Sequence, residues 1–228
     1  MQINIRQGKK MSNLTNAIKS NLISGGAYSL ILKALIVTVA ITVIAWIIAA
    51  AVGAVFSYFM CYEITVVSGL AKALSFLFRS TPVLLLMLFF NFGIFGSVNV
   101  PAALLAAVSI GLYGAGHFSE IIMKSVSEHE DFKNREIRRR LRSAFFVAAL
   151  PEGTKRSLFQ VKRLVIQLMQ WTTVAGYISA NELTKVMQQI GNRTMYPLFS
   201  IAFSIIVYLV ATIIIELIFS VIEKKLNN

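Results

Sequence analysis

The chain has 228 residues, enough for one or two domains; 57% of them are hydrophobic and only 14% are charged. A soluble domain has about 45–50% apolar and about 25% charged residues, so this balance excludes an ordinary soluble protein and predicts several membrane spans. The formal net charge of +12 raises the alternative of a nucleic-acid-binding protein. We reject it, because the excess lies beside apolar runs, where the positive-inside rule accounts for it, and no aromatic-basic nucleic-acid motif occurs.

The first 30 residues are polar and mixed, and we expect them to form an N-terminal segment that precedes a membrane domain at residues 31–226. Residues 13–23 are predicted to form a short interfacial helix, because Leu14, Ile18 and Leu22 recur at four-residue spacing. The apolar run that follows is too long for a signal peptide and lacks an obvious small-residue cleavage site. We therefore expect the first span to be retained.

Five membrane spans are predicted, which makes the fold class an all-α membrane protein. A helix needs about 20 apolar residues to cross the hydrocarbon core, and residues 34–62, 80–119 and 194–215 carry no charge. The first and third runs fit one span each, and the second fits two spans joined by a turn at residues 93–101. A weaker fourth span carries several polar residues. The predicted spans are residues 35–59, 76–92, 102–123, 164–181 and 198–222.

The sequence between these spans makes smaller structural predictions. Pro82 lies near the start of the second span, in the first turn of a helix, and Arg79 beside it is expected to reach the headgroups. Three glycines near the end of the third span, Gly111, Gly114 and Gly116, should allow close helix packing. Residues 61–72 are expected to form a loop or a short helix, and residues 182–197 a loop.

Residues 124–163 form a basic stretch that holds 11 of the 22 Lys and Arg residues. Because Lys and Arg collect in cytoplasmic loops, we place this stretch in the cytoplasm between the third and fourth spans. Lys224 and Lys225, after the fifth span, then lie on the same side, and the N-terminus lies outside. The stretch is either a surface for another protein or a solvated or lipid-binding face.

No catalytic or metal-binding constellation is evident. The chain has no phosphate loop and no nucleophile–base pair, and its single Cys61 and two His residues form no metal site. We therefore do not expect an enzyme. His117 lies in a predicted span, where it is either a pore group or a partner for a neighbouring helix. Glu120 is either a helix-end residue or part of a translocation path.

Three segments of the chain carry a resemblance to a known family: residues 77–90, LFRSTPVLLLMLFF, residues 150–156, LPEGTKR, and residues 181–194, NELTKVMQQIGNRT. They resemble, in turn, the segments "FRGTPLLVQLFF", "LPQALR" and "ELTRAAQQIASRT" of bacterial ABC importer permeases for polar amino acids, of the histidine, glutamine, arginine and opine type. The segments occur in the family's order, and the resemblance covers residues 22–226.

The resemblance implies a subunit of a larger transporter in the bacterial cytoplasmic membrane. It implies a second permease, identical or homologous, two cytoplasmic ATPase subunits that bind the ATP, and an extracytoplasmic binding protein for an amino acid. It places the basic stretch at the family's EAA loop, which docks on the ATPase. We expect these residues to couple to the ATPase: Glu136, Arg138, Arg139, Arg140, Arg142, Leu150 and Pro151.

Two departures from the family qualify what the resemblance implies. The EAA positions fall on residues 132–134 and the turn glycine on Arg138, so we expect docking by charge in place of small-residue packing. The family's "NEFIALLKDTSL" run aligns with residues 163–174, where Leu164 and Trp171 replace the acidic positions; this argues against a cationic substrate. The expected substrate path is Gln167, Gln170, Trp171, Thr172 and Thr173, although Gln167 and Gln170 are alternatively interhelical contacts.

A second function remains open. The altered EAA loop is also compatible with a membrane scaffold or regulatory subunit that transports nothing. An ATPase that co-purifies with the chain favours the importer over the scaffold.

Overall fold

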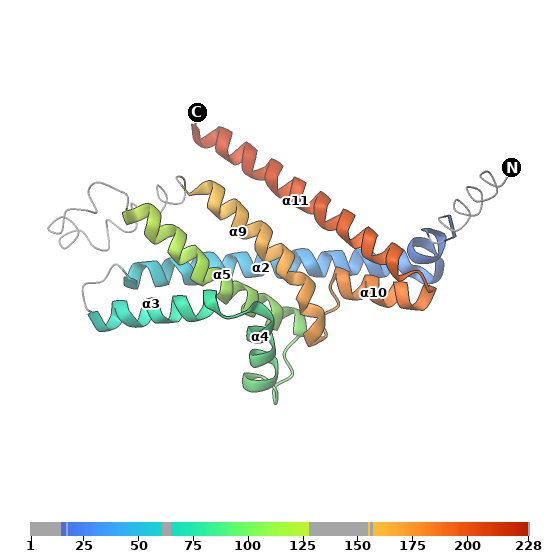
Figure 1. The fold of residues 1–228 in the computed structure, drawn as a ribbon, viewed down its shortest axis with the longest axis horizontal. Helices are drawn as coiled ribbons and strands as arrows, with labels where there is room; N and C mark the ends of the chain where they lie inside the picture. Colours follow the sequence, from blue (N-terminus) through green and yellow to red (C-terminus); the bar gives the residue numbers. More distant parts are fainter. Residues whose placement is uncertain (1–14, 17, 61–64, 128–154, 156, 228) are drawn as a thin grey trace.

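The computed structural model describes residues 15–16, 18–60, 65–127, 155 and 157–227. These residues form helices, with no strand among them, in agreement with the all-α prediction. The three longest helices are α2 (Ala27–Met60), α5 (Ala102–Ser127) and α11 (Pro197–Asn227). In Figure 1, α2 follows the long axis, α3 (Thr65–Ser80) runs beside it, and α5, α9 (Leu158–Trp171) and α11 cross obliquely.

Among the described residues, three helices are long and apolar enough to cross a membrane: Ala27–Met60, Ala102–Ser125 and Pro197–Leu226. They contain the predicted spans 35–59, 102–123 and 198–222. With a rise of about 1.5 Å per residue, the 34 residues of α2 extend about 51 Å, more than the roughly 30 Å of the hydrocarbon core. The chain is therefore an integral membrane protein in which α2 is longer than the bilayer core requires.

The second predicted span, residues 76–92, is a sharply bent pair of helices. α3 ends at Ser80, and α4 (Val83–Leu88) runs on into the π-helical turn η3 (Phe89–Ile94). The two pieces, Val66–Ser80 and Val83–Ile94, are bent by 104°. Pro82 stands at the break because it lacks an N–H donor and disfavours a helical Thr81. One straight helix was expected here, and a hinge-like joint is observed.

The fourth predicted span, residues 164–181, has a less regular form. α9 tightens at Thr172 into the 3₁₀-helix η4 (Thr172–Ile178) and stops at Ser179, whose φ of 71° is left-handed. Among the described residues, this segment is not one of the helices suited by length and composition to span a membrane. The count of five spans therefore stays a prediction.

The region expected to be a loop, residues 182–197, is mostly helical instead. Leu183–Thr194 form α10, and its buried side chains are Leu183, Val186, Met187 and Ile190. Their spacing is that of one face of an amphipathic helix. The loop prediction was wrong because it followed the polar composition of this region and overlooked the periodicity.

The core lies where α2 crosses α5, and small residues bring the two helices together. A Cβ at Gly111 would lie 2.7 Å from Cβ of Ile48, and one at Gly114 would lie 2.8 Å from Cβ of Ala49. A Cβ at Gly116 would lie 2.6 Å from the backbone oxygen of Ser75 on α3. The expected close packing at these three glycines is thus observed, and it joins α5 to both α2 and α3.

The N-terminal segment contacts the far end of the chain. Of the interfacial helix expected at residues 13–23, the structure describes 15–16 and 18–23, with a π-helical turn at Lys19–Ile23. Asn21 is fully buried, and its Oδ1 accepts hydrogen bonds from Thr194 at 2.8 Å and Ser200 at 2.9 Å. This contact ties the chain's first described turns to α10 and α11.

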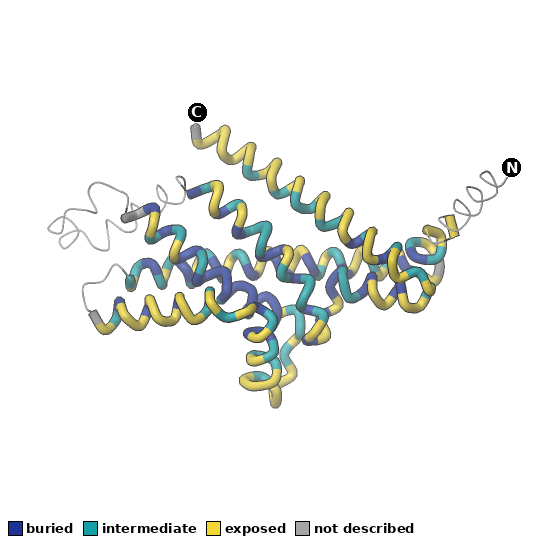
Figure 2. Tube along the Cα trace, in the orientation of Figure 1, coloured by how far each residue is buried: buried dark blue, intermediate teal, exposed yellow. Residues whose placement is uncertain are grey.

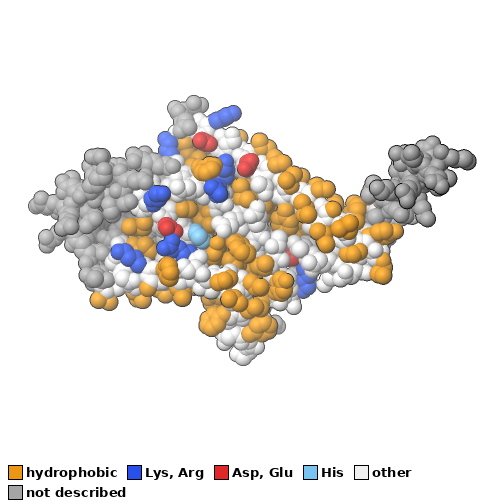
Figure 3. All heavy atoms as spheres, viewed as in Figure 1, with side chains coloured by type: hydrophobic (Ala, Val, Ile, Leu, Met, Phe, Trp, Pro, Cys, Tyr) orange, Lys and Arg blue, Asp and Glu red, His pale blue; other side chains and the backbone are white. Residues whose placement is uncertain are grey.

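α11 lies largely outside the core. No residue in its most apolar 18-residue stretch is buried within the chain. Figure 2 shows the helix exposed along most of its length. Figure 3 shows that, on this face, most Lys and Arg side chains gather toward the ends of α5, α9 and α11, whereas many hydrophobic side chains are exposed along α11 and over α4. An apolar helix of this kind is suited to contact with lipid or with another membrane helix.

Candidate translocation pocket

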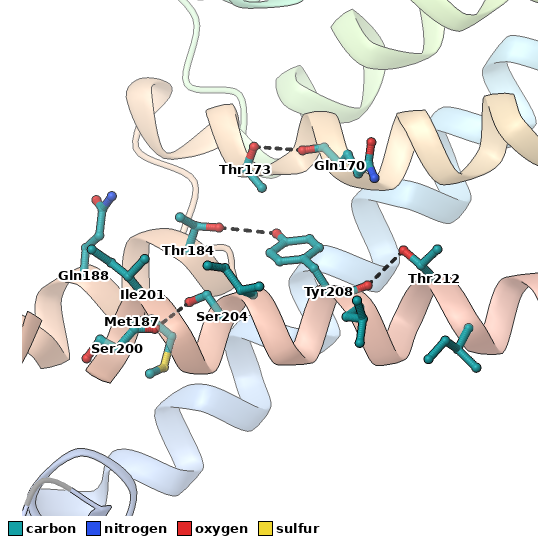
Figure 4. A pocket seen from close by; sticks show the side chains of 13 residues that line it. Gln170, Thr173, Thr184, Met187, Gln188, Ser200, Ile201, Ser204, Tyr208 and Thr212 are labelled. Carbon is teal, nitrogen blue, oxygen red and sulfur yellow. Dashed lines mark hydrogen bonds between the residues drawn. The ribbon is translucent and has the colours of Figure 1, made fainter. Parts of the chain in front are cut away.

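A pocket of about 780 Å³ lies between α9, α10 and α11 (Figure 4). Uncharged polar side chains alternate with apolar ones along its wall, and the phenol of Tyr208 is the only ionisable group among its described lining residues. The polar lining residues are Gln170, Thr173, Thr184, Gln188, Ser200, Ser204, Tyr208 and Thr212. A cavity with polar groups inside a largely apolar wall is the usual form of a small-molecule site.

The hydroxyl groups of the pocket are mostly tied to their own helices. Thr173 donates to the Gln170 carbonyl at 2.8 Å, and Ser204 donates to the Ser200 carbonyl at 3.0 Å. Each such oxygen keeps lone pairs that can accept a further hydrogen bond. The side-chain amides of Gln170 and Gln188 bond to no described residue, so they are the lining groups that can both donate to and accept from a solute.

Tyr208 organises the inner wall of this pocket. Its hydroxyl lies 3.1 Å from that of Thr172 and 3.5 Å from that of Thr184, and it donates to Glu182 Oε2 at 3.3 Å. These partners come from η4, α10 and the residue that precedes α10. One phenol on α11 therefore holds three segments of the chain together at one point.

Glu182 is fully buried and caps α10. Its carboxylate oxygens accept hydrogen bonds from the Thr184 and Lys185 amides, both at 2.7 Å, which satisfies donors left open at the start of the helix. Burial raises the pKa of the Glu182 carboxyl above its ordinary value, and the hydrogen bonds from Thr184 and Lys185 offset part of that rise. Sequence reasoning missed Glu182 and Tyr208; the four buried apolar residues of α10 were the signal for a helix that needed a cap.

Only two of the five residues of the expected substrate path line this pocket. Gln170 and Thr173 line the pocket. Thr172 is fully buried behind it, where its hydroxyl donates to the Met169 carbonyl at 2.7 Å. Gln167 and Trp171 lie on another face of α9 and contact α5, so they line no part of this pocket.

The α5-facing residues of α9 meet an aromatic cluster. Gln167 Nε2 donates to the Tyr113 hydroxyl at 2.9 Å, and the Trp171 ring meets the Tyr113 ring edge to face, with centroids 5.9 Å apart. The His117 ring packs on Tyr113 at 4.6 Å. His117 Nε2 and Trp171 Nε1 are buried and bond to none of the described residues. Gln167 thus makes a contact between α9 and α5, as the alternative interpretation of this residue predicted.

Arg79 and Glu120 form an ion pair that links α3 to α5. Arg79 was expected to reach the headgroups, and Glu120 was expected either at a helix end or in the translocation path. The observed pair stands one turn before the break at Pro82, and Arg79 also lies 5.6 Å over the Phe76 ring. Both charges therefore serve a contact within the chain and fix α3 against α5 beside the bend.

The residues expected to couple to an ATPase lie outside the described part of the chain. This applies to Glu136, Arg138, Arg139, Arg140, Arg142, Leu150 and Pro151. The helices on either side of them, α5 and α9, are described and pack against each other.

Two solved transporters share this fold over most of the chain. The crystal structure of an amino acid ABC transporter with histidines aligns with a TM-score of 0.76 and 19% identity, covering 90% of this chain and 98% of that one. The MetNI methionine ABC transporter, in an inward-facing conformation, aligns with a TM-score of 0.69 and 15% identity, covering 89% and 99%. No family profile and no curated protein matches the sequence. The chain has the fold of an ABC importer permease.

Proposed function

We propose that the chain is the permease subunit of an ATP-driven importer that carries an amino acid across the bacterial cytoplasmic membrane by alternating access. The observation that carries the proposal is the likeness in fold to a permease of an amino acid ABC transporter over nine-tenths of the chain. The three segments at residues 77–90, 150–156 and 181–194, in the family's order, support it independently.

The proposed assembly follows from that role. The chain pairs with a second permease, identical or homologous, takes its substrate from an extracytoplasmic binding protein, and docks on two ATPase subunits that bind and hydrolyse the ATP. With the five predicted spans, the N-terminus would lie outside and the basic stretch 124–163 in the cytoplasm, in accord with the positive-inside rule. Coupling runs through the charges of Glu136 and the arginines 138–140 and 142, with Leu150 and Pro151 after them.

The pocket supports an amino acid with an uncharged side chain as the substrate. Its described lining offers amides and hydroxyls but no carboxylate for a cationic side chain and no Lys or Arg for an anionic one. Burying an unpaired charge there would be costly, whereas a neutral polar side chain would exchange hydrogen bonds with water for bonds to Gln170 and Gln188.

Reconstitution of the whole assembly tests the proposal. The chain, co-expressed with a candidate ATPase and its binding protein, is purified and placed in liposomes, and uptake of radiolabelled amino acids is followed with and without ATP. We expect an ATPase to co-purify and uptake to require ATP. A chain that brings down no ATPase and supports no uptake would instead be the scaffold or regulatory subunit that the altered EAA positions 132–134 suggest.

A further inference from the structure

A second groove lies at the opposite side of α10, against the beginning of α2. It has a volume of about 410 Å³ and is bounded by α2, α10 and the connection before α10. Its floor is apolar and includes the buried residues Ala34, Val186 and Ile190. Its rim is polar and exposed, and it carries Lys33 on α2 and Arg193 on α10. The groove thus combines two cationic side chains at its rim with an apolar floor.

Neither cation is neutralised within the described chain. Lys33 and Arg193 form no ion pair there, since the one described salt bridge joins Arg79 to Glu120. No Asp or Glu lines the groove. The nearest carboxyl in sequence, Glu182, is buried and bonded to Thr184, Lys185 and Tyr208. The groove therefore presents an uncompensated positive potential to whatever occupies it.

Both cations directly precede uncharged runs of the sequence. Lys33 is the last charge before the uncharged run 34–62, which begins in α2, and Arg193 is the last before the uncharged run 194–215 that leads into α11. Charged residues that flank spans in this way lie at the headgroup layer. Two helices far apart in sequence thus bring one cation each to one groove, and we expect both at the depth of lipid phosphates.

Local backbone structure places Arg193. Its guanidinium lies 3.5 Å from the position that a Cβ would occupy at Gly25, where φ is +63°. The turn at Ser24–Gly26 needs this left-handed glycine. The guanidinium of Arg193 thus lies beside the turn that leads into α2.

We propose that this groove binds the headgroup of an anionic phospholipid, with its phosphate between Lys33 and Arg193 and the start of an acyl chain on the apolar floor. A lipid fits better than a free anion because the floor is apolar and the groove lies where bilayer lipid is always present. Asn181 and Gln189, also on the rim, can donate hydrogen bonds to headgroup oxygens. The proposal does not depend on which solute the chain transports.

Photo-crosslinking tests the site. The purified full chain in phosphatidylcholine nanodiscs receives trace photoactivatable phosphatidylglycerol, and cross-linked peptides are mapped by mass spectrometry. We expect cross-links within residues 27–37 and 186–193, weakened about fivefold by each of Lys33→Gln and Arg193→Gln and more by both. Lys185→Gln is the matched control, since it removes a cation from α10 outside the groove. Arg193→Lys, which keeps the charge, should retain the cross-links.

Two further arms separate the alternatives. A photoactivatable phosphatidylcholine should label these segments no more than other lipid-exposed helix surfaces. Excess inorganic phosphate should leave the phosphatidylglycerol cross-links in place. Equal labelling by both lipids, or labelling unchanged in the double variant, would overturn the proposal; loss of labelling in phosphate would show a site for a soluble anion instead.

Discussion

The hydroxyl of Tyr208 and the carboxylate of Glu182 meet at 3.3 Å, and this contact fastens α11 to the start of α10. Among the described residues, Tyr208 and Ser200 make all of the side-chain hydrogen bonds from α11 to other elements. Both lie in the first half of the helix. These polar contacts in a largely apolar setting act together with the packing of Phe203, Val207 and Phe219 to hold α11 in place.

Removing the phenol hydroxyl should loosen this attachment. We expect Tyr208→Phe to lower the free energy of unfolding by about 1 kcal/mol, because Glu182, Thr172 and Thr184 each lose a partner. Thermal unfolding in detergent, followed by intrinsic fluorescence, measures the change. Tyr177→Phe is the control, since Tyr177 is 71% exposed. Equal effects of the two variants would show that the Tyr208 contacts contribute nothing specific.

The stability of the chain should depend on pH through Glu182. Its folded pKa is raised above the ordinary value of 4.5, so it contributes stability that is fully present below that value and lost as the pH rises through the folded pKa. Gln at position 182 does not titrate. The melting temperature of the wild type minus that of Glu182→Gln should therefore increase as the pH falls from neutral toward 4.5. A difference that stays constant over this range would contradict the prediction.

Gly116 should not tolerate a side chain. A Cβ there would lie 2.6 Å from the Ser75 carbonyl oxygen and 2.9 Å from the Arg79 nitrogen, both backbone atoms that move only with α3. We expect Gly116→Ala to destabilise the protein by about 1–3 kcal/mol. Gly69→Ala on α3 is the matched control, because nothing lies within 4 Å of its Cβ. That variant should be neutral or stabilising by up to about 1 kcal/mol. Similar losses in both would argue against close α3–α5 packing.

Gln170 and Gln167 should differ in what their loss affects. Gln170 lines the pocket and bonds to no described side chain, so Gln170→Ala should raise the KM of ATP-driven uptake about fivefold with little change in melting temperature. Gln167 donates to Tyr113, so Gln167→Ala should lower the melting temperature. Uptake kinetics and unfolding of both variants in the reconstituted assembly provide the test. An unaltered KM in Gln170→Ala would remove this pocket from the transport path.

The basic stretch should couple uptake to ATP hydrolysis. Replacing Arg138, Arg139 and Arg140 with Ala is expected to leave ATP hydrolysis by the partner running without uptake, since docking by charge would be lost. The two rates are measured side by side in proteoliposomes. Replacement of Lys224 and Lys225, on the same proposed side of the membrane, should leave their ratio unchanged. If coupling survives in the triple variant, this stretch has another role.

The sequence predicted the elements that depend on local pattern. Uncharged runs located α2, α5 and α11, and glycine spacing on α5 predicted its close packing. The bend at Pro82 was missed because a proline is compatible both with the first turn of a helix and with the joint between two helices. Which occurs depends on how α3 packs against α5, through contacts such as Ser75 with Ser119 at 2.7 Å. Those contacts are long-range and leave no local signal.

The site was only partly predictable for a similar reason. Polarity singled out residues 167–173 of α9 and η4, but it could not say which neighbour each side chain faces. Gln167 and Gln170 are three residues apart, yet the helix turns them toward α5 and the pocket, respectively. Tyr208 lies in an apolar run, where nothing in the sequence distinguishes it from the other residues of the predicted span. Its role appears only when α9, α10 and α11 come together.

The described hydrogen bonds that attach α11 to other elements all come from its first half, and this has a mechanical consequence. Beyond Tyr208 the helix continues to Lys224 and Lys225 with no further described hydrogen bond to another element. Sixteen residues of helix make an arm of about 24 Å, so a tilt of about 10° around Tyr208 would carry its far end through about 4 Å. A rearrangement around Glu182 that tilted α11 about Tyr208 would therefore be magnified toward the C-terminal end of the helix.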